Sequence, residues 1–143
     1  MLDLGFDDVT NKENSFRLKA SLFMLGTDVL IIISGMNDHI GSITLAQPYI
    51  APLNPNIPAK HVSENKFERI SSSISTLTQY HHRDDQILAE FSRKICQQLN
   101  RVVTVIGGIH VDNISKEEIV IITQMLSSLQ EKIIQRFNKR LDN

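Results

Sequence analysis

The stretch VLIIIS at residues 29–34 most limits the folds that this chain can adopt. Its successive positions are apolar and mostly β-branched, so both faces of an extended strand would be apolar there. A strand of this kind is typical of the centre of a sheet that is covered rather than solvated. We therefore expect residues 29–34 to form a central strand.

Four other segments have the character of strands. Residues 16–25 alternate imperfectly and are joined to 29–34 by Gly26-Thr27-Asp28, which predicts a hairpin. The remaining three expected strands are 42–49, 70–79 and 102–109. Pro48 lacks an amide hydrogen, so it is expected to end its strand or to place it at an edge.

Two segments are predicted to be amphipathic helices. Asp84 or Asp85 caps the first, which runs to about Asn100 with apolar residues every four positions. Ser115 and Glu118 have capping-box spacing, so the second helix begins there and runs to about Arg140. Its expected buried residues are Ile119, Ile122, Leu126, Leu129, Ile133 and Phe137. Three further apolar residues lie beside that stripe and favour a partner contact or a homodimer: Ile121, Met125 and Ile134.

The predicted order is β-β-β-β-α-β-α, an α/β (α+β) fold with one mixed five-stranded sheet and two main helices. A length of 143 residues fits a single domain spanning 1–143. Residues 1–14 are expected to be a polar lead-in. Residues 50–69 contain three prolines and are expected to be a loop insertion.

Composition excludes several classes of protein. The net charge is −1, from 15 basic and 16 acidic residues, which argues against a nucleic-acid-binding surface. The longest apolar block is too short to span a bilayer, and the N-terminus does not resemble a signal peptide. A single cysteine, Cys96, allows no internal disulfide and favours the cytoplasm.

Three histidines follow strands that are expected to run in the same direction. If the first four strands meander, 29–34 and 70–79 are parallel, and a helical crossover makes 102–109 parallel to them. His39, His82 and His110 then arrive at one edge of the sheet, outside the carboxyl ends of the strands, where ligands often bind. This arrangement predicts a binding site. Three histidines can also hold zinc or another divalent metal with one position open.

Three short segments resemble a known family: HIGSITLAQP (39–48), HRDD (82–85) and GIHVDNISKEEI (108–119). Together they make the chain similar to the prenylated-flavin chaperones, the small accessory proteins of hydroxyarylic-acid decarboxylase systems. The resemblance covers about residues 15–140. It implies a fold similar to that of the proteasome-assembly chaperones.

The resemblance also implies a function, which is to bind prenylated FMN, or FMN, and to help deliver it to a UbiD-type decarboxylase without catalysis. The residues that it implies as cofactor contacts are His39, Gly41, His82, Arg83, Gly108, His110 and Asp112. Two other functions stay open. One is an assembly chaperone or interaction module without a small-molecule ligand. The other is a small zinc-dependent hydrolase that uses His39, His82 and His110.

Overall fold

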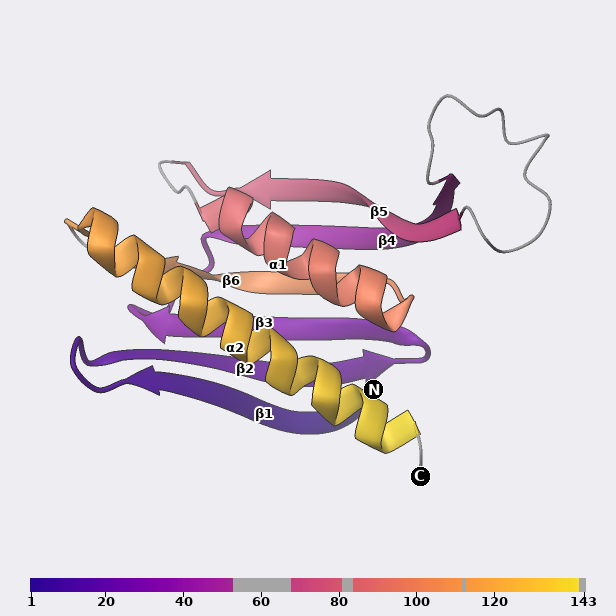
Figure 1. Cartoon of the computed structure of the whole chain (residues 1–143), viewed down its shortest axis with the longest axis horizontal. Helices are drawn as coiled ribbons and strands as arrows, with labels where there is room; N and C mark the ends of the chain where they lie inside the picture. The colour runs from indigo at the N-terminus through magenta and orange to yellow at the C-terminus, as the bar shows by residue number, and fades with distance from the viewer. Residues whose placement is uncertain (53–67, 81–83, 112, 142–143) are drawn as a thin grey trace.

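The chain forms a six-stranded sheet with both helices packed on one face (Figure 1). The computed structural model describes residues 1–52, 68–80, 84–111 and 113–141. The strands lie in the order β1-β2-β3-β6-β4-β5. The elements are β1 (Leu2–Asn11), β2 (Phe16–Leu25), β3 (Asp28–Met36), β4 (Ser42–Pro52), β5 (Glu68–Thr78), α1 (Asp84–Leu99), β6 (Val103–His110) and α2 (Lys116–Leu141).

The predicted α/β class, the single sheet and the two helices are confirmed, but the sheet has six strands rather than five. The additional strand is β1, which lies within the segment expected to be a polar lead-in and pairs with β2. Leu4 is buried in the core, and Asp7 forms an ion pair with Arg136 of α2. Contacts with distant residues therefore fix a segment whose own sequence is too acidic to indicate a strand.

Strand β6 lies between β3 and β4, so the expected meander of the first four strands is wrong. It is parallel to β3 and antiparallel to β4, and β4 is antiparallel to β5. Strands β3, β5 and β6 consequently run in the same direction, as expected. The carboxyl ends of all three reach the same edge of the sheet.

Strand β4 is longer than expected and continues through Pro48 to Pro52. Strand β6 pairs with β4 only from Ser42 to Ala46, so Pro48 lies beyond β6, where β4 has a neighbour on one side only. A residue without an amide hydrogen is tolerated there. The ends of the expected 50–69 insertion are thus strand, and its centre, 53–67, lies outside the described residues.

The helices begin and end close to the predicted residues. The capping box is present, since Glu118 N donates to Ser115 Oγ at 3.1 Å and Ser115 N donates to Glu118 Oε2 at 2.8 Å. Five of the six residues predicted for the buried face of α2 are buried, but Ile119 is exposed. Met125 is buried in the core, so it is not available for the partner contact that its position suggested.

Cys96 is buried on α1 and is a free thiol. Burial raises the pKa of this thiol, which suits a small core residue rather than a nucleophile. Of the two helices described, neither is both long and apolar enough to cross a membrane.

Candidate histidine site

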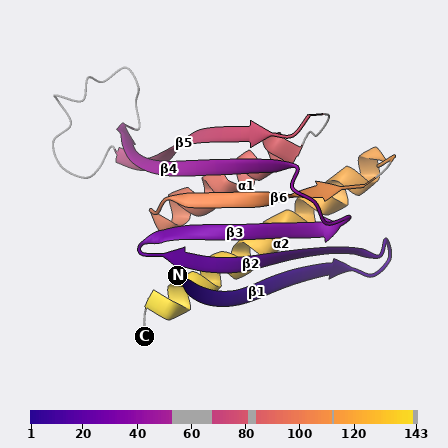
Figure 2. The same cartoon turned by 180° about the vertical axis from the view of Figure 1, so that it is seen from behind.

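The position of β6 brings His39 and His110 together. Because β6 separates β3 from β4, the connection from Asn37 to Gly41 has to cross the end of β6 to reach β4 (Figure 2). His110 is the last residue of β6. The two imidazole rings lie with centroids 5.8 Å apart and planes at 89°, which is an edge-to-face arrangement.

Local backbone geometry directs the His39 side chain. The chain leaves β3 through Met36, whose φ of 48° lies in the left-handed region and turns the backbone sharply. His39 Nδ1 then lies 2.8 Å from the carbonyl oxygen of Asn37. A carbonyl only accepts hydrogen bonds, so Nδ1 carries a proton, and in the neutral ring Nε2 carries the lone pair.

Two glycines let neighbouring segments approach β6 closely, Gly108 on the side of the crossing segment and Gly107 on the side of β3. A Cβ on Gly108 would collide with the imidazole of His39, so only glycine leaves room for the ring. Gly107 has φ +145°, and a Cβ there would collide with the carbonyl of Ile33. Gly41 N donates to Gly107 O at 3.0 Å, and Gln79 N donates to Gly41 O at 2.8 Å. The chain just after β5 is thereby tied to the same edge.

A shallow hollow of about 610 Å³ adjoins His39 on this edge. It is lined by His39, Ile40, Gly41, Ser42, Ile43, Leu77, Thr78 and Gln79. Two of its aliphatic side chains are strongly exposed, Ile40 at 60% and Leu77 at 73%. The site therefore combines two imidazoles with an uncovered apolar wall, which is a suitable combination for a ligand with an aromatic ring and polar groups.

Four of the seven predicted contact residues come together at this edge: His39, Gly41, Gly108 and His110. The other three, His82, Arg83 and Asp112, lie outside the described residues. Sequence reasoning missed Asn37, which orients His39, and Leu77, which supplies part of the wall. Leu77 could have been identified from the sequence, because it is an apolar residue at the end of a serine- and threonine-rich strand.

Within the described part of the chain, no cluster of three or more His, Cys, Asp or Glu side chains is placed to hold a metal ion. His39 and His110 supply two imidazoles to the proposed three-histidine metal site, and the third, His82, is not described. The metal hypothesis therefore stays a prediction.

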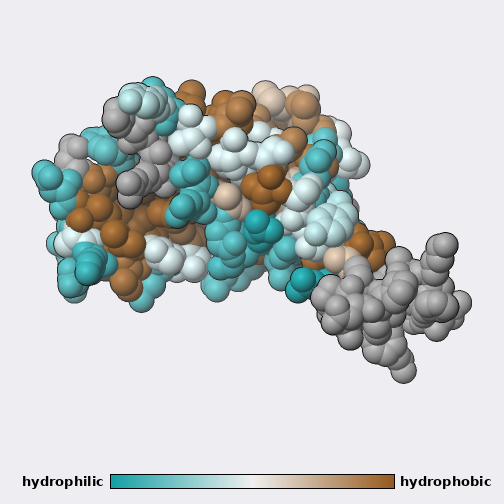
Figure 3. Space-filling model, turned by 90° about the horizontal axis from the view of Figure 1, so that it is seen from above, coloured by the Kyte–Doolittle hydropathy of each residue, from teal (hydrophilic) through white to brown (hydrophobic). Residues whose placement is uncertain are grey.

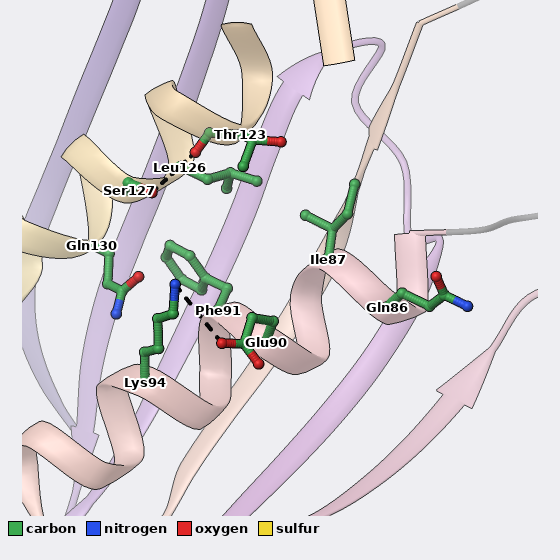
Figure 4. A pocket seen from close by; sticks show the side chains of 9 residues that line it. All are labelled: Gln86, Ile87, Glu90, Phe91, Lys94, Thr123, Leu126, Ser127 and Gln130. Carbon is green, nitrogen blue, oxygen red and sulfur yellow. Dashed lines mark hydrogen bonds and ion pairs between the residues drawn. The ribbon is translucent and has the colours of Figure 1, made fainter. Parts of the chain in front are cut away.

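A second, smaller hollow of about 230 Å³ lies between α1 and α2 (Figure 4). Phe91 and Leu126 form its apolar floor, and Lys94 and Glu90 pair with each other at its margin at 3.7 Å. Its other polar side chains are amides and hydroxyls. This hollow has no histidine among its lining residues, and its two charged side chains pair with each other, so the chemistry favours the edge of the sheet.

Comparison with known proteins identifies the family. Residues 12–138 match the model of the prenylated flavin chaperone LpdD-like domain. The chain belongs to the LpdD-like chaperone family. The LpdD-like match covers most of the described structure, including all the residues of the histidine site that the structure describes.

Two individual proteins are similar to this LpdD-like chain. Protein LpdD of Lactiplantibacillus plantarum is 26% identical over 126 residues, which cover 87% of this chain and 80% of that protein. A chain from the crystal structure of a chaperone complex for yeast 20S proteasome assembly aligns with a TM-score of 0.48 at 9% identity. That alignment covers 91% of this chain and 99% of the other.

Proposed function

We propose that this LpdD-like chain is a non-catalytic chaperone that binds prenylated FMN, or FMN, at the histidine site. It would assist the maturation of a UbiD-type aromatic-acid decarboxylase in the cytoplasm. The description of its family supports the cofactor class. The observation that carries the proposal is the edge-to-face pair of His39 and His110 beside an exposed aliphatic wall.

The wall is suited to the flavin ring. Ile40, Ile43 and Leu77 expose aliphatic surface beside His39, and a planar aromatic ring placed on them would remove that surface from water. Burial of apolar surface contributes roughly 25 cal/mol per Å². A flavin ring that covers most of this wall therefore gains a substantial part of its binding free energy from the burial of apolar surface.

The imidazoles are suited to the polar parts of the cofactor. A protonated imidazole donates from both nitrogens and forms charge-assisted hydrogen bonds to a phosphate. In a neutral His39, Nδ1 donates to the carbonyl oxygen of Asn37, which holds the ring in place beside the hollow. Arg83 and His82 would add donors from the segment that follows β5, and Asp112 follows His110 by two residues in the sequence.

A titration with FMN and with prenylated FMN tests the proposal. Purified protein should retain a flavin absorbance spectrum through gel filtration, and His110→Ala should weaken retention at least tenfold. Lys94→Ala, on the helical side of the sheet, should bind as the parent does. A folded parent protein that retains neither flavin would contradict the proposal, as would a His110→Ala variant with unchanged affinity.

The flavin titration also separates the proposal from the two other functions. An interaction module without a ligand would bind a decarboxylase subunit equally well with and without flavin. A zinc-dependent hydrolase would purify with stoichiometric zinc, which elemental analysis of the parent and of His39→Ala detects. Flavin-dependent activation of a UbiD-type decarboxylase by the parent protein is the result expected here.

A further inference from the structure

The hollow between α1 and α2 contains a buried polar side chain whose position the fold does not explain. Gln130 of α2 exposes only 9% of its surface, and it points toward α1 (Figure 4). Within the residues that the structure describes, no hydrogen bond engages its amide. Burial of an amide without a partner is unfavourable, so such a position is more typical of a binding site than of a core.

The other buried side chains of this hollow are apolar. Phe91 and Leu126 form its floor and are 3% and 5% exposed, and Ile87 completes the wall. The hydroxyls of Thr123 and Ser127 also line the hollow, but each donates to the carbonyl four residues earlier in α2, at 2.8 and 3.1 Å. An apolar floor with a buried amide that is free to bond is the usual composition of a small-molecule site.

The margin of the hollow on α1 carries more positive than negative charge. Glu90 pairs with Arg93 at 3.4 Å and with Lys94 at 3.7 Å, so one carboxylate faces two cations. Glu131 of α2 lines the adjoining hollow, and within the described residues it forms no ion pair with Lys94. The ammonium of Lys94 is half-exposed, so it can turn toward an anion bound beside Gln130.

The volume of the hollow, about 230 Å³, limits the size of its ligand. An engineered apolar cavity of about 150 Å³ in another protein binds benzene. Sites for drug-sized ligands usually exceed about 300 Å³. The hollow is therefore large enough for one aromatic ring with a substituent, and it is too small for a fused-ring cofactor such as a flavin.

We propose that this hollow binds a single-ring aromatic carboxylate. The ring would lie on Phe91 and Leu126, and the carboxylate would accept hydrogen bonds from the amide of Gln130 and from the ammonium of Lys94. Hydrogen bonds to a charged group are the stronger ones, so they add to the small contribution of the apolar floor. The inference does not depend on the proposed function, because no residue lines both this hollow and the hollow beside His39.

Titration of the protein with benzoate, followed by NMR of the backbone amides, tests the proposal. Benzoate should bind saturably, with shifts confined to α1 and α2. Benzyl alcohol has the same ring and no charge, and it should bind at least about tenfold more weakly. Equal affinities for the two probes would overturn the assignment of a carboxylate. Absence of a saturable shift with benzoate would overturn the site itself, including the case in which the hollow accepts only a side chain of a partner protein.

Gln130→Leu separates ligand binding from a structural role. Leucine has nearly the volume of glutamine but lacks the amide, so benzoate should bind at least about tenfold more weakly, whereas the Tm should rise because an unpaired buried amide is removed. Gln124→Leu is the matched control, because Gln124 is exposed on the same helix and does not line the hollow. Its benzoate affinity should equal that of the parent. A lower Tm for Gln130→Leu, or an unchanged benzoate affinity, would contradict the proposal.

Exposed apolar surface could also bind an aromatic ring without a built site. Hydrophobic surface gathers at the end of the molecule where α2 begins (Figure 3). Ile119 and Val120 are exposed there, and neither lines the hollow. Val120→Lys should therefore leave benzoate binding unchanged. Binding that is lost in Val120→Lys and kept in Gln130→Leu would place the ring on this end of α2 and would overturn the proposal.

Discussion

The imidazole of His39 lies directly against the backbone of Gly108, in the space that a Cβ at that position would occupy. The two residues come from segments far apart in the sequence. The histidine is on the connection that crosses from β3 to β4, and the glycine is inside β6. Their contact exists because β6 lies between β3 and β4.

Substitution of Gly108 by alanine should displace His39 without unfolding the sheet. The added Cβ meets the imidazole and the backbone of Gly41, while the extended backbone at Gly108 accepts an L residue. Flavin affinity should fall at least tenfold, and the histidine resonances in an NMR spectrum should shift. An unchanged spectrum for the His39 ring would show that the contact is absent in solution.

Gly107→Ala is the matched comparison for this prediction. Its positive φ and the nearby carbonyl of Ile33 oppose any side chain, so the strain falls on the pairing of β3 with β6. This variant should lose at least about 1 kcal/mol of unfolding free energy. Gly108→Ala should lose less, and the reverse order of stabilities would contradict both assignments.

Lysine should replace Arg136 only in part at the contact between α2 and β1. Its guanidinium donates to both carboxylate oxygens of Asp7, at 2.7 and 2.8 Å, and also to the carbonyls of Leu4 and Phe6. The hydrogen bond to Asp7 raises the pKa of Arg136. Lysine cannot match this forked geometry.

The contact is partly exposed, so the expected cost of Arg136→Lys is modest, about 1 kcal/mol. Hydrogen exchange measures the effect where it should be largest, in the amides of β1. Lys139→Arg, near the end of the same helix, serves as the control for general effects of exchanging these cations. Equal protection of β1 in the parent and in Arg136→Lys would show that packing alone holds the strand.

The capping box of α2 should make the folding stability of the protein depend on pH. The backbone hydrogen bond from Ser115, followed by that from its side chain, lowers the pKa of Glu118 below its ordinary value of 4.5. A lowered pKa in the folded state stabilises the protein above the unfolded pKa, and this stabilisation is lost as the pH falls through the folded pKa.

Glu118→Gln should therefore melt a few degrees lower than the parent at neutral pH, and the gap should close in acid. Thermal unfolding followed by circular dichroism at several pH values measures the gap. Glu131→Gln, in the middle of the same helix, is expected to show no such convergence. A gap that is constant with pH would mean that the carboxylate charge does not contribute through the cap.

Thr44→Val should stabilise the fold. Thr44 is fully buried on β4, and its Oγ1 has no hydrogen-bond partner in the described part of the chain. Valine has nearly the same shape and removes the cost of burying the hydroxyl, which is about 1–3 kcal/mol when unpaired. The expected rise in Tm is a few degrees. Thr76→Val, at the paired position on β5, is the control with a partly exposed hydroxyl, and a lower Tm for Thr44→Val would reveal a partner for Oγ1.

Both helices and five of the six strands could be predicted because their signals are local. Apolar periodicity indicated α1 and α2, and the Ser115–Glu118 spacing located the start of α2. Strand β1 could not be predicted in this way, because its sequence, LDLGFDDVTN, is acidic and contains glycine. Its pairing depends on β2 and on Arg136, which lies far away along the chain.

The sequence predicted which residues belong to the candidate site but not how the fold brings them together. The common direction of β3, β5 and β6 was predicted correctly, although from a meander that the structure does not have, and it was enough to bring His39 and His110 to one edge. No local sequence pattern indicates that β6 pairs between β3 and β4. That insertion is what places the crossing segment over Gly108, so the contact itself could come only from the structure.

The placement of β6 also has a consequence for biosynthesis. Until residues 103–110 have been synthesised, no strand can pair with both β3 and β4, so the β1–β3 meander and the β4–β5 hairpin cannot form the single sheet seen here. Before then, His39 cannot contact Gly108, because Gly108 belongs to β6. A nascent or truncated chain that lacks β6 should therefore lack the contact between His39 and Gly108 on which the predicted site depends.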